Sequence, residues 1–180
     1  LSGMQVREED MPVIQLAFVP FQNDLKLKKI VDAYFKDSQI ENKCNANKEE
    51  YLNKISYVVS YTAWQEYYDH HYDYALKLIN ILIDNNLATN EDLLLKSKIY
   101  LARADTPESN REALLILEEA EKSGPFLLSD IYKEKGIVLL RLNQPEEAFK
   151  AFKKLEEILQ TDNTDNRQLK WCRYMMHKCQ

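Results

Sequence analysis

The chain has 180 residues, a length typical of one domain, of which 45% are hydrophobic and 29% are charged. Because it contains only three glycines and five prolines, an all-β fold with many tight turns is disfavoured and a helical fold is favoured. The formal net charge of −5 provides no basic face to neutralise phosphates, so nucleic acid is not expected as a partner.

Residues 1–47 are predicted to form an N-terminal arm and a helix. The segment Pro12–Pro20 is expected to be an extended arm, because its flanking prolines argue against a central strand. It follows the acidic stretch Arg7–Asp10, whereas a signal peptide has a basic leader, and no apolar run in the chain reaches the ~18 residues of a membrane span. The apolar spacing of Leu25–Phe35 predicts a helix, and the polar composition of Ser38–Asn47 predicts a loop.

From about residue 48 onward, apolar residues recur with helical spacing almost without a break, which predicts six successive helices. Pro107 and Pro145 precede acidic residues and are expected to begin helices, where proline is tolerated and carboxylates are favoured. Gly124–Pro125 is expected to end a helix, with the glycine in a left-handed conformation. A further amphipathic helix is predicted within Asp165–Cys179. The six apolar stripes begin at Tyr51, Ala75, Leu93, Ala113, Ile131 and Ala148.

Small residues recur at matching places in these helix pairs, at intervals of about 35 residues. Glycine inside a helix costs roughly 1 kcal/mol relative to alanine, so Gly136 is expected to mark a close approach of another helix. We expect the helix that begins near Pro145 to pack there, with Ala148 as the other half of the contact. The paired small positions are Ala63 and Ala75, Ser97 and Ala113, and Gly136 and Ala148.

This pattern resembles the tetratricopeptide repeat (TPR), a helix pair of about 34 residues with a small residue in its first helix and an alanine and an aromatic in its second. The best unit is Ser129–Asp162, then about Asn90–Pro125, whereas Ser56–Ala88 is weakest because it lacks a terminal proline. The resemblance implies an all-α fold: a right-handed α-solenoid of about three TPR-like helix pairs, with an N-terminal helical extension and a C-terminal capping helix. It places the repeat domain and cap in residues 48–180.

The resemblance also implies a binding surface, because the first helices of successive TPR pairs line a concave groove that holds peptides. Tyrosine, tryptophan and arginine anchor interfaces, so these groove positions suit a mixed apolar peptide. The family's carboxylate clamp is not expected, because Ser60, Trp64 and Leu95 occupy its matching positions. The groove positions are Tyr57, Ser60, Trp64 and Tyr67; Glu91, Leu94, Lys98 and Leu101; Asp130, Lys133, Ile137 and Arg141; and Arg167, Trp171 and Tyr174.

The tyrosine-rich run over residues 57–74 also has a structural interpretation. In a stacked helix pair, Tyr61 and Tyr72 are candidates to fill gaps between helices as part of the core. Core packing and ligand contact both remain open for this run.

No enzymatic signature occurs in the chain. There is no GxSxG, HExxH or CxxC motif, and three scattered glycines cannot build a phosphate-binding loop. The nearest approach to a metal cluster is His70 and His71 with Asp69 and Asp73, but adjacent residues point in different directions, so a polar turn between helices is favoured. We therefore expect no catalysis, no cofactor and no metal.

The expected function is a non-catalytic scaffold (an adaptor, co-chaperone or assembly factor) that binds a protein or peptide on its concave face. The alternative is a structural subunit or homo-oligomer whose groove is filled by its own or a neighbour's N-terminal arm, Pro12–Phe21. The cysteines Cys44, Cys172 and Cys179 lack the spacing of a disulfide framework, which favours a reducing, cytoplasmic location unless a leader is missing.

Overall fold

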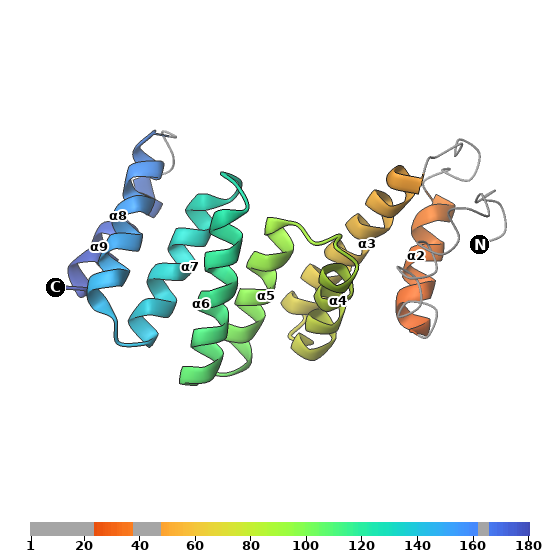
Figure 1. Cartoon of the computed structure of the whole chain (residues 1–180), viewed down its shortest axis with the longest axis horizontal. Helices are drawn as coiled ribbons and strands as arrows, with labels where there is room; N and C mark the ends of the chain where they lie inside the picture. The colour runs from red at the N-terminus through yellow and green to blue at the C-terminus, as the bar shows by residue number, and fades with distance from the viewer. Residues whose placement is uncertain (1–23, 38–47, 162–165) are drawn as a thin grey trace. The chain divides into compact units, whose positions relative to one another are not determined.

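The computed structural model describes residues 24–37, 48–161 and 166–180. Over these residues it contains eight α-helices and no strand, which confirms the predicted all-α class (Figure 1). The predicted arm Pro12–Pro20 and loop Ser38–Asn47 lie outside the described residues. The helices are α2 (Leu25–Asp37), α3 (Lys48–Tyr68), α4 (Tyr72–Asp84), α5 (Asn90–Arg103), α6 (Pro107–Lys122), α7 (Leu128–Arg141), α8 (Pro145–Thr161) and α9 (Asn166–Lys178).

The chain divides into two compact units between Ala88 and Thr89. The N-terminal unit holds α2, α3 and α4, and the C-terminal unit holds α5 to α9. The predicted boundary between residues 47 and 48 therefore falls inside the N-terminal unit, where α2 packs against α3.

Several helix starts follow from side-chain caps that the sequence carries. The hydroxyl of Thr89 accepts a hydrogen bond from the Asp92 amide, and the Asp92 carboxylate accepts one from the Thr89 amide, a reciprocal capping box at the start of α5. Thr106 caps α6 by accepting from the Ser109 amide at 3.2 Å. Helices α6 and α8 begin at Pro107 and Pro145, as predicted.

Two of the turns place an asparagine where the backbone takes a positive φ. Asn86 ends the α3–α4 pair with φ 56°, and Asn143 joins α7 to α8 with φ 57°. Asparagine is among the few residues other than glycine that visit this region readily. Gly124 follows the end of α6 with φ 143°, a positive value that favours glycine, as predicted.

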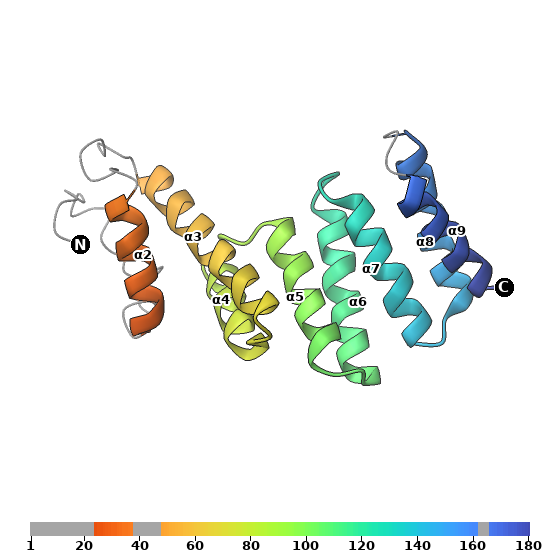
Figure 2. The ribbon, with the colours of Figure 1, turned by 180° about the vertical axis from the view of Figure 1, so that it is seen from behind.

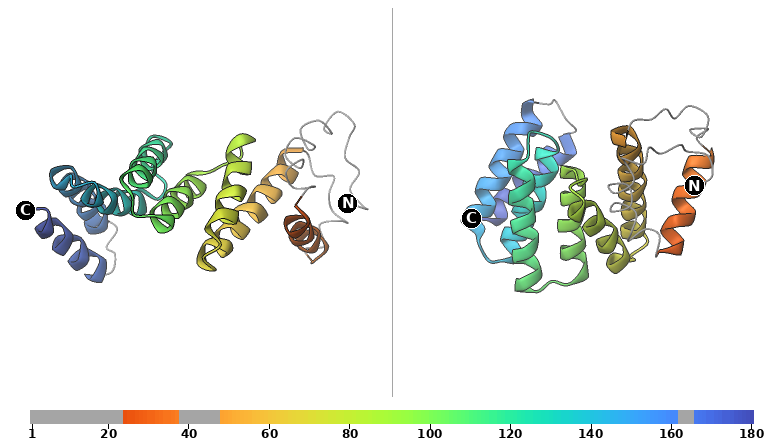
Figure 3. Two further views of the ribbon diagram at one scale, coloured as in Figure 1. Left: turned by 90° about the horizontal axis from the view of Figure 1, so that it is seen from below. Right: turned by 45° about the vertical axis from the view of Figure 1, so that its right-hand side comes forward.

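The N-terminal unit is built on the antiparallel pair α3–α4 (Figure 3). Its apolar stripes are buried as predicted, and α2 adds the buried side chains Leu27 and Val31. Burial of such stripes is the main source of stability for short helices, which are marginal alone. The buried apolar residues of the pair include Ile55, Val58, Val59, Ala63, Ala75, Leu78, Ile79 and Leu82.

In the C-terminal unit each helix packs against the next along the chain, and α5 also contacts α7 (Figures 1 and 2). Two buried clusters hold the unit together. One joins α5, α6 and α7 around Leu94, Leu117 and Ile131. The other joins α7, α8 and α9 around Phe152 and Cys172.

The six small residues that define the repeat pattern are all buried. At Gly136 the expected close approach of α8 is confirmed: an added Cβ would lie 2.7 Å from Phe152 Cδ1 and closer still to two other ring atoms. The nearest atoms belong to Phe152, one turn beyond the predicted partner Ala148. The small residue of α7 therefore makes room for an aromatic ring of α8.

None of the helices in the described ranges is both long and apolar enough to cross a membrane.

Candidate functional site

Side-chain contacts link the first helices of the pairs in the C-terminal unit. Lys98 on α5 forms an ion pair with Glu134 on α7. Arg141 on α7 donates a hydrogen bond to the carbonyl oxygen of Leu101 on α5, with a separation of 3.1 Å. The contacts join α5 and α7 on the face where the repeat pattern predicts ligand-facing positions, and they occupy part of the hydrogen-bonding capacity of Lys98 and Arg141.

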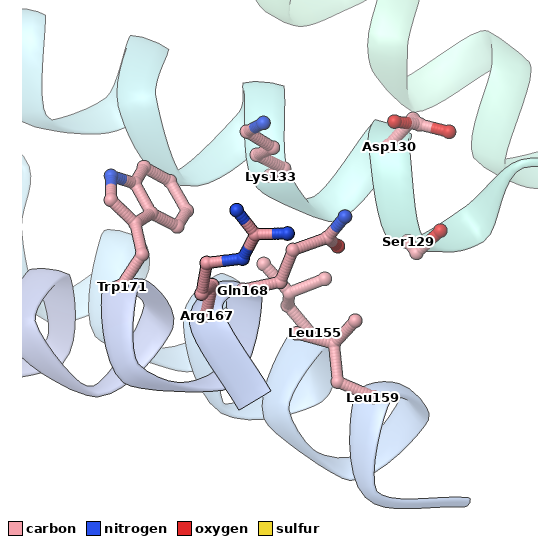
Figure 4. Close-up of a pocket in the computed structure, with 8 residues that line it drawn as sticks. All are labelled: Ser129, Asp130, Lys133, Leu155, Leu159, Arg167, Gln168 and Trp171. Atoms are coloured by element: carbon pink, nitrogen blue, oxygen red, sulfur yellow. The ribbon is translucent and has the colours of Figure 1, made fainter. Parts of the chain in front are cut away.

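A pocket of about 300 Å³ opens between α7, α8 and α9 (Figure 4). Four of its lining residues, Asp130, Lys133, Arg167 and Trp171, are predicted groove positions on two different helices. The structure thus brings together residues that are far apart in the sequence and that only the repeat pattern had related. The complete lining is Ser129, Asp130, Lys133, Leu155, Leu159, Arg167, Gln168 and Trp171.

The floor and one wall of the pocket are apolar. Leu155 and Leu159 of α8 are buried members of the α7–α9 core and form part of the lining. The indole of Trp171 packs edge-on against Phe152, with ring centroids 5.8 Å apart and an interplanar angle of 85°. Edge-to-face packing of this kind fixes an aromatic side chain in place. The ring of Phe152 in turn packs against Gly136 of α7, so the wall of the pocket is backed by the packed core.

The rim of the pocket is predominantly basic. Lys133 Nζ lies 5.3 Å from the centroid of the Trp171 ring, a cation–π distance, and Lys133 makes no ion pair with any residue the structure describes. Arg167 also lines the rim, and Asp130 supplies the one carboxylate among the lining residues. Helix α9 carries the lysines and arginines Arg167, Lys170, Arg173 and Lys178 and no Asp or Glu, in a chain whose net charge is −5.

The remaining predicted groove residues of this unit differ in exposure. Tyr174 is 55% exposed on α9, with Lys178 Nζ 4.9 Å from its ring centroid. Ile137 is half-buried against the α7–α9 core. Leu94 is only 4% exposed and belongs to the α5–α7 core, so its side chain offers little surface to a ligand.

In the N-terminal unit, the aromatic residues of α3 form an exposed stripe. Tyr57, Tyr61 and Tyr68 are 61%, 55% and 68% exposed, so the expectation that Tyr61 fills a gap between helices is wrong. The rings of Tyr57 and Tyr61 stack with centroids 6.3 Å apart. Trp64 and Tyr67 are half-buried, and Trp64 Nε1 is buried without a hydrogen-bond partner. The stripe arises because residues four apart lie on one side of a helix.

His70 and His71 lie in the turn between α3 and α4, as predicted. His71 Nδ1 is 2.9 Å from Glu66 Oε2, and Lys26 Nζ on α2 is 2.5 Å from Glu66 Oε1. Burial opposes ionisation of Glu66, but hydrogen bonds from Lys26 and His71 outweigh it and hold the pKa of this carboxyl below its ordinary value. Within the described ranges no group of three His, Cys, Asp or Glu side chains is placed to hold a metal ion.

A half-buried carboxylate, Glu121, ties three helices together at the side of the α6–α8 stack. It accepts hydrogen bonds from Tyr132 at 2.7 Å and Lys135 at 2.6 Å, both on α7, and Lys154 of α8 lies 3.7 Å away. Burial alone would raise the pKa of Glu121, but the donors and the two ammonium groups lower it. The acidic residues of α6 look in the sequence like an ordinary solvated face, so this network had no sequence signal.

The two cysteines in the described residues are free thiols with little nucleophilic character. Cys172 is buried and donates to the Phe152 carbonyl oxygen at 3.1 Å, and burial, with a smaller effect of Glu156, raises its pKa to about 11. Burial also raises the pKa of Cys179. Because the thiolate is the reactive form, neither is poised for covalent chemistry.

No family model, no curated protein and no solved structure matches this chain.

Proposed function

We propose that the protein is a non-catalytic scaffold of the TPR type, a right-handed solenoid of about three helix pairs that binds a protein or peptide. In the C-terminal unit, the binding face is the one formed by α5, α7 and α9. A helical repeat suits such a role because each repeat contacts only its neighbours and leaves a continuous surface for a ligand.

The pocket at α7 and α9 is the observation that carries this proposal. The repeat frame assigns Lys133 and Trp171 to ligand-facing positions on separate helices, and both line the same hollow. A concave site with an apolar floor and a few polar groups at its edge is the usual form of a binding site.

The polar groups of the pocket favour binding over catalysis. They comprise one lysine, one arginine, one amide, one hydroxyl and one carboxylate, with no histidine or cysteine. General acid–base or nucleophilic catalysis requires a nucleophile, or an acid and a base, within hydrogen-bonding reach of each other. Groups of the kind present here orient a ligand by charge and hydrogen bonding.

A photo-crosslinking experiment on the full chain tests the proposal. A photoreactive phenylalanine analogue replaces Tyr174, an exposed residue of the proposed face, or Leu115, which is 60% exposed on α6. We expect a protein crosslinked through position 174 to bind the purified chain directly, and the position-115 probe to yield no crosslink to it. Crosslinking through position 115 alone would place the interaction elsewhere and refute the assignment of the face.

A further inference from the structure

We propose that the pocket between α7, α8 and α9, here called the α7–α9 pocket, recognises an acidic side chain next to a large apolar side chain in a peptide segment. This inference rests on the proposed scaffold function and names the chemistry of the ligand at one site. Its two parts, apolar and anionic, follow from different residues.

The apolar part follows from the floor and wall of the pocket. Leu155, Leu159 and the Trp171 ring present a hydrocarbon surface at the bottom of the hollow. A volume of about 300 Å³ lies at the lower end of the range for ligand sites, so it holds one large side chain and adjoining backbone rather than a whole helix. Burial of such a side chain favours binding, because it removes apolar surface from water.

The anionic part follows from the two cations at the rim. Figure 4 shows the side chains of Arg167 and Trp171 extending from α9 toward α7, which carries Lys133. The Lys133 ammonium has the Trp171 ring as its neighbour and no carboxylate partner among the described residues. The Lys133 ammonium is therefore the donor offered to a carboxylate, and the positive charge of Arg167 nearby adds to the attraction.

Charge complementarity extends beyond the pocket itself. Helix α9 is basic along its whole length while the complete chain is acidic. An acidic segment is therefore attracted to this helix in preference to other surfaces, which favours both its rate of association and its orientation. The negative total charge disfavours a long polyanion such as nucleic acid. A side-chain carboxylate of a peptide is the occupant that fits.

The test is a selection of short random peptides displayed without a free C-terminus, on the full-length chain. We expect the enriched peptides to share Asp or Glu beside Leu, Met, Phe or Trp. Synthetic versions with amidated C-termini should bind the Lys133→Glu/Arg167→Glu variant at least about tenfold more weakly than the wild type, because the variant loses the attraction and adds charge repulsion. Replacement of their Asp or Glu by Asn or Gln should weaken binding to the wild type similarly.

The matched control is Lys153→Glu, which reverses an exposed charge on α8 outside the pocket lining and should leave peptide affinity within about twofold. Circular dichroism establishes that each variant keeps its helical content. Enrichment of peptides without acidic residues, or equal binding to the wild type and the double variant, would overturn the inference. Competition by single-stranded DNA at the same affinity would overturn it as well.

The scaffold proposal and this inference fail separately. If non-acidic peptides are enriched and crosslink through position 174, the scaffold proposal stands and the ligand chemistry is wrong. If nothing crosslinks through position 174 and no peptide is enriched, the face itself is not a binding surface.

Discussion

At the scale of single residues, the contact of Gly136 with Phe152 leaves no room for a side chain at this position of α7. Glycine lowers helix propensity, yet the ring of Phe152 occupies the space that any Cβ would need. Phe152 is completely buried and packed edge-on against Trp171, so it cannot swing away without disturbing the wall of the α7–α9 pocket. Packing therefore outweighs the gain in propensity that alanine would bring.

Replacement of Gly136 tests this balance. We expect Gly136→Ala to destabilise the protein by about 1–2 kcal/mol, because an overpacking cost of about 1–3 kcal/mol exceeds a propensity gain of roughly 1 kcal/mol. Gly136→Leu should cost more. Urea unfolding followed by circular dichroism measures the effect. A urea midpoint of the alanine variant equal to or above that of the wild type would show that the Phe152 ring moves aside freely.

A double variant assigns the cost to its source. Phe152→Leu alone should destabilise by opening a cavity, but Gly136→Ala/Phe152→Leu should be more stable than the sum of the two single effects predicts. A coupling energy of about 0.5–3 kcal/mol is typical for residues in contact. Strict additivity would mean that the clash lies elsewhere.

The small residues of the repeat pattern are among those that sequence reasoning placed correctly. Ala63, Ser97 and Gly136 are predictable because a missing side chain inside an apolar stripe has few explanations other than close packing. The position of a large amphipathic residue is harder to predict from the sequence. Core packing was one interpretation of Tyr61, but its side chain is exposed. A tyrosine satisfies its ring in the core and its hydroxyl in water, so periodicity alone does not decide its side of the helix.

At the scale of the secondary-structure elements, helix starts are set locally and are open to direct test. The capping box of α5 satisfies two backbone amides that lack partners inside the helix. Thr89→Ala should lower the free energy of unfolding of the C-terminal unit by about 1 kcal/mol, whereas Thr89→Ser keeps the hydroxyl and should stay close to the wild type. Urea titrations compare the three proteins. If the alanine and serine variants lost equal free energy of unfolding, the Thr89 hydroxyl would not be what stabilises the start of α5.

The docking of α2 depends on buried carboxylates rather than on apolar surface alone. Asp24, just before α2, accepts hydrogen bonds from Lys77 of α4 at 2.8 Å and from the Leu27 amide at 3.1 Å. Burial would raise the pKa of Asp24, but these donors and the charge of Lys77 hold it below its ordinary value. Asp24 and Glu66 together therefore join α2 to α3 and α4 in their ionised forms.

The stability of the N-terminal unit should consequently depend on acid pH. A carboxyl whose folded pKa is depressed stabilises the fold above its unfolded value, here 4.5 for Glu66 and 3.8 for Asp24, and this contribution is lost as pH falls through the lower folded values. We expect the free energy of unfolding to fall between about pH 5 and pH 3, and to fall less in Glu66→Gln.

Urea unfolding at several pH values, with Asp69→Asn as an exposed control, isolates the contribution of Glu66. The control should follow the wild-type curve. If Glu66→Gln follows it too, the Glu66 ion pairs do not contribute to the stability of the unit.

Most of the elements were predictable, and the reason is periodicity. The predicted helix Leu25–Phe35 is observed as Leu25–Asp37, and proline and asparagine marked the breaks between the later helices. The ion pairs of Lys26 with Glu66 and of Lys77 with Asp24 were not predictable, because each joins residues 40 or more positions apart through polar atoms. Apolar spacing contains no information about which distant lysine a carboxylate meets.

At the scale of the whole molecule, the candidate site shows what a repeat frame adds to a single sequence. The frame related Lys133 and Trp171, although they lie on different helices. The frame did not assign Leu155, Leu159 or Gln168 to a binding site. The two leucines belong to the core stripe of α8, and Gln168 of α9 follows no pattern in the sequence. The rim residues of the pocket are therefore predictable from the repeat pattern. Its floor and its depth depend on how the helices pack together.

The division between Ala88 and Thr89 yields a prediction for the molecule as a whole. Both buried clusters of the C-terminal unit consist only of residues that follow Thr89, and the cap of α5 begins at Thr89 itself. A fragment of residues 89–180 should therefore fold alone into a helical protein that unfolds cooperatively in urea, since repeat arrays are stabilised mainly by contacts between neighbours. Within that fragment, Gly136→Leu should lower the unfolding midpoint as it does in the complete chain.

A shorter fragment, residues 89–125, is the matched control. It keeps α5 and α6 but removes Ile131 and Val138 of α7, which complete the buried cluster around Leu94 and Leu117. We expect this helix pair to show little helical structure by circular dichroism and no cooperative transition, because a single pair cannot bury its apolar face. If residues 89–180 were unfolded while the complete chain is folded, the stability of the C-terminal unit would have to come from the first 88 residues, and the two units would be one cooperative structure.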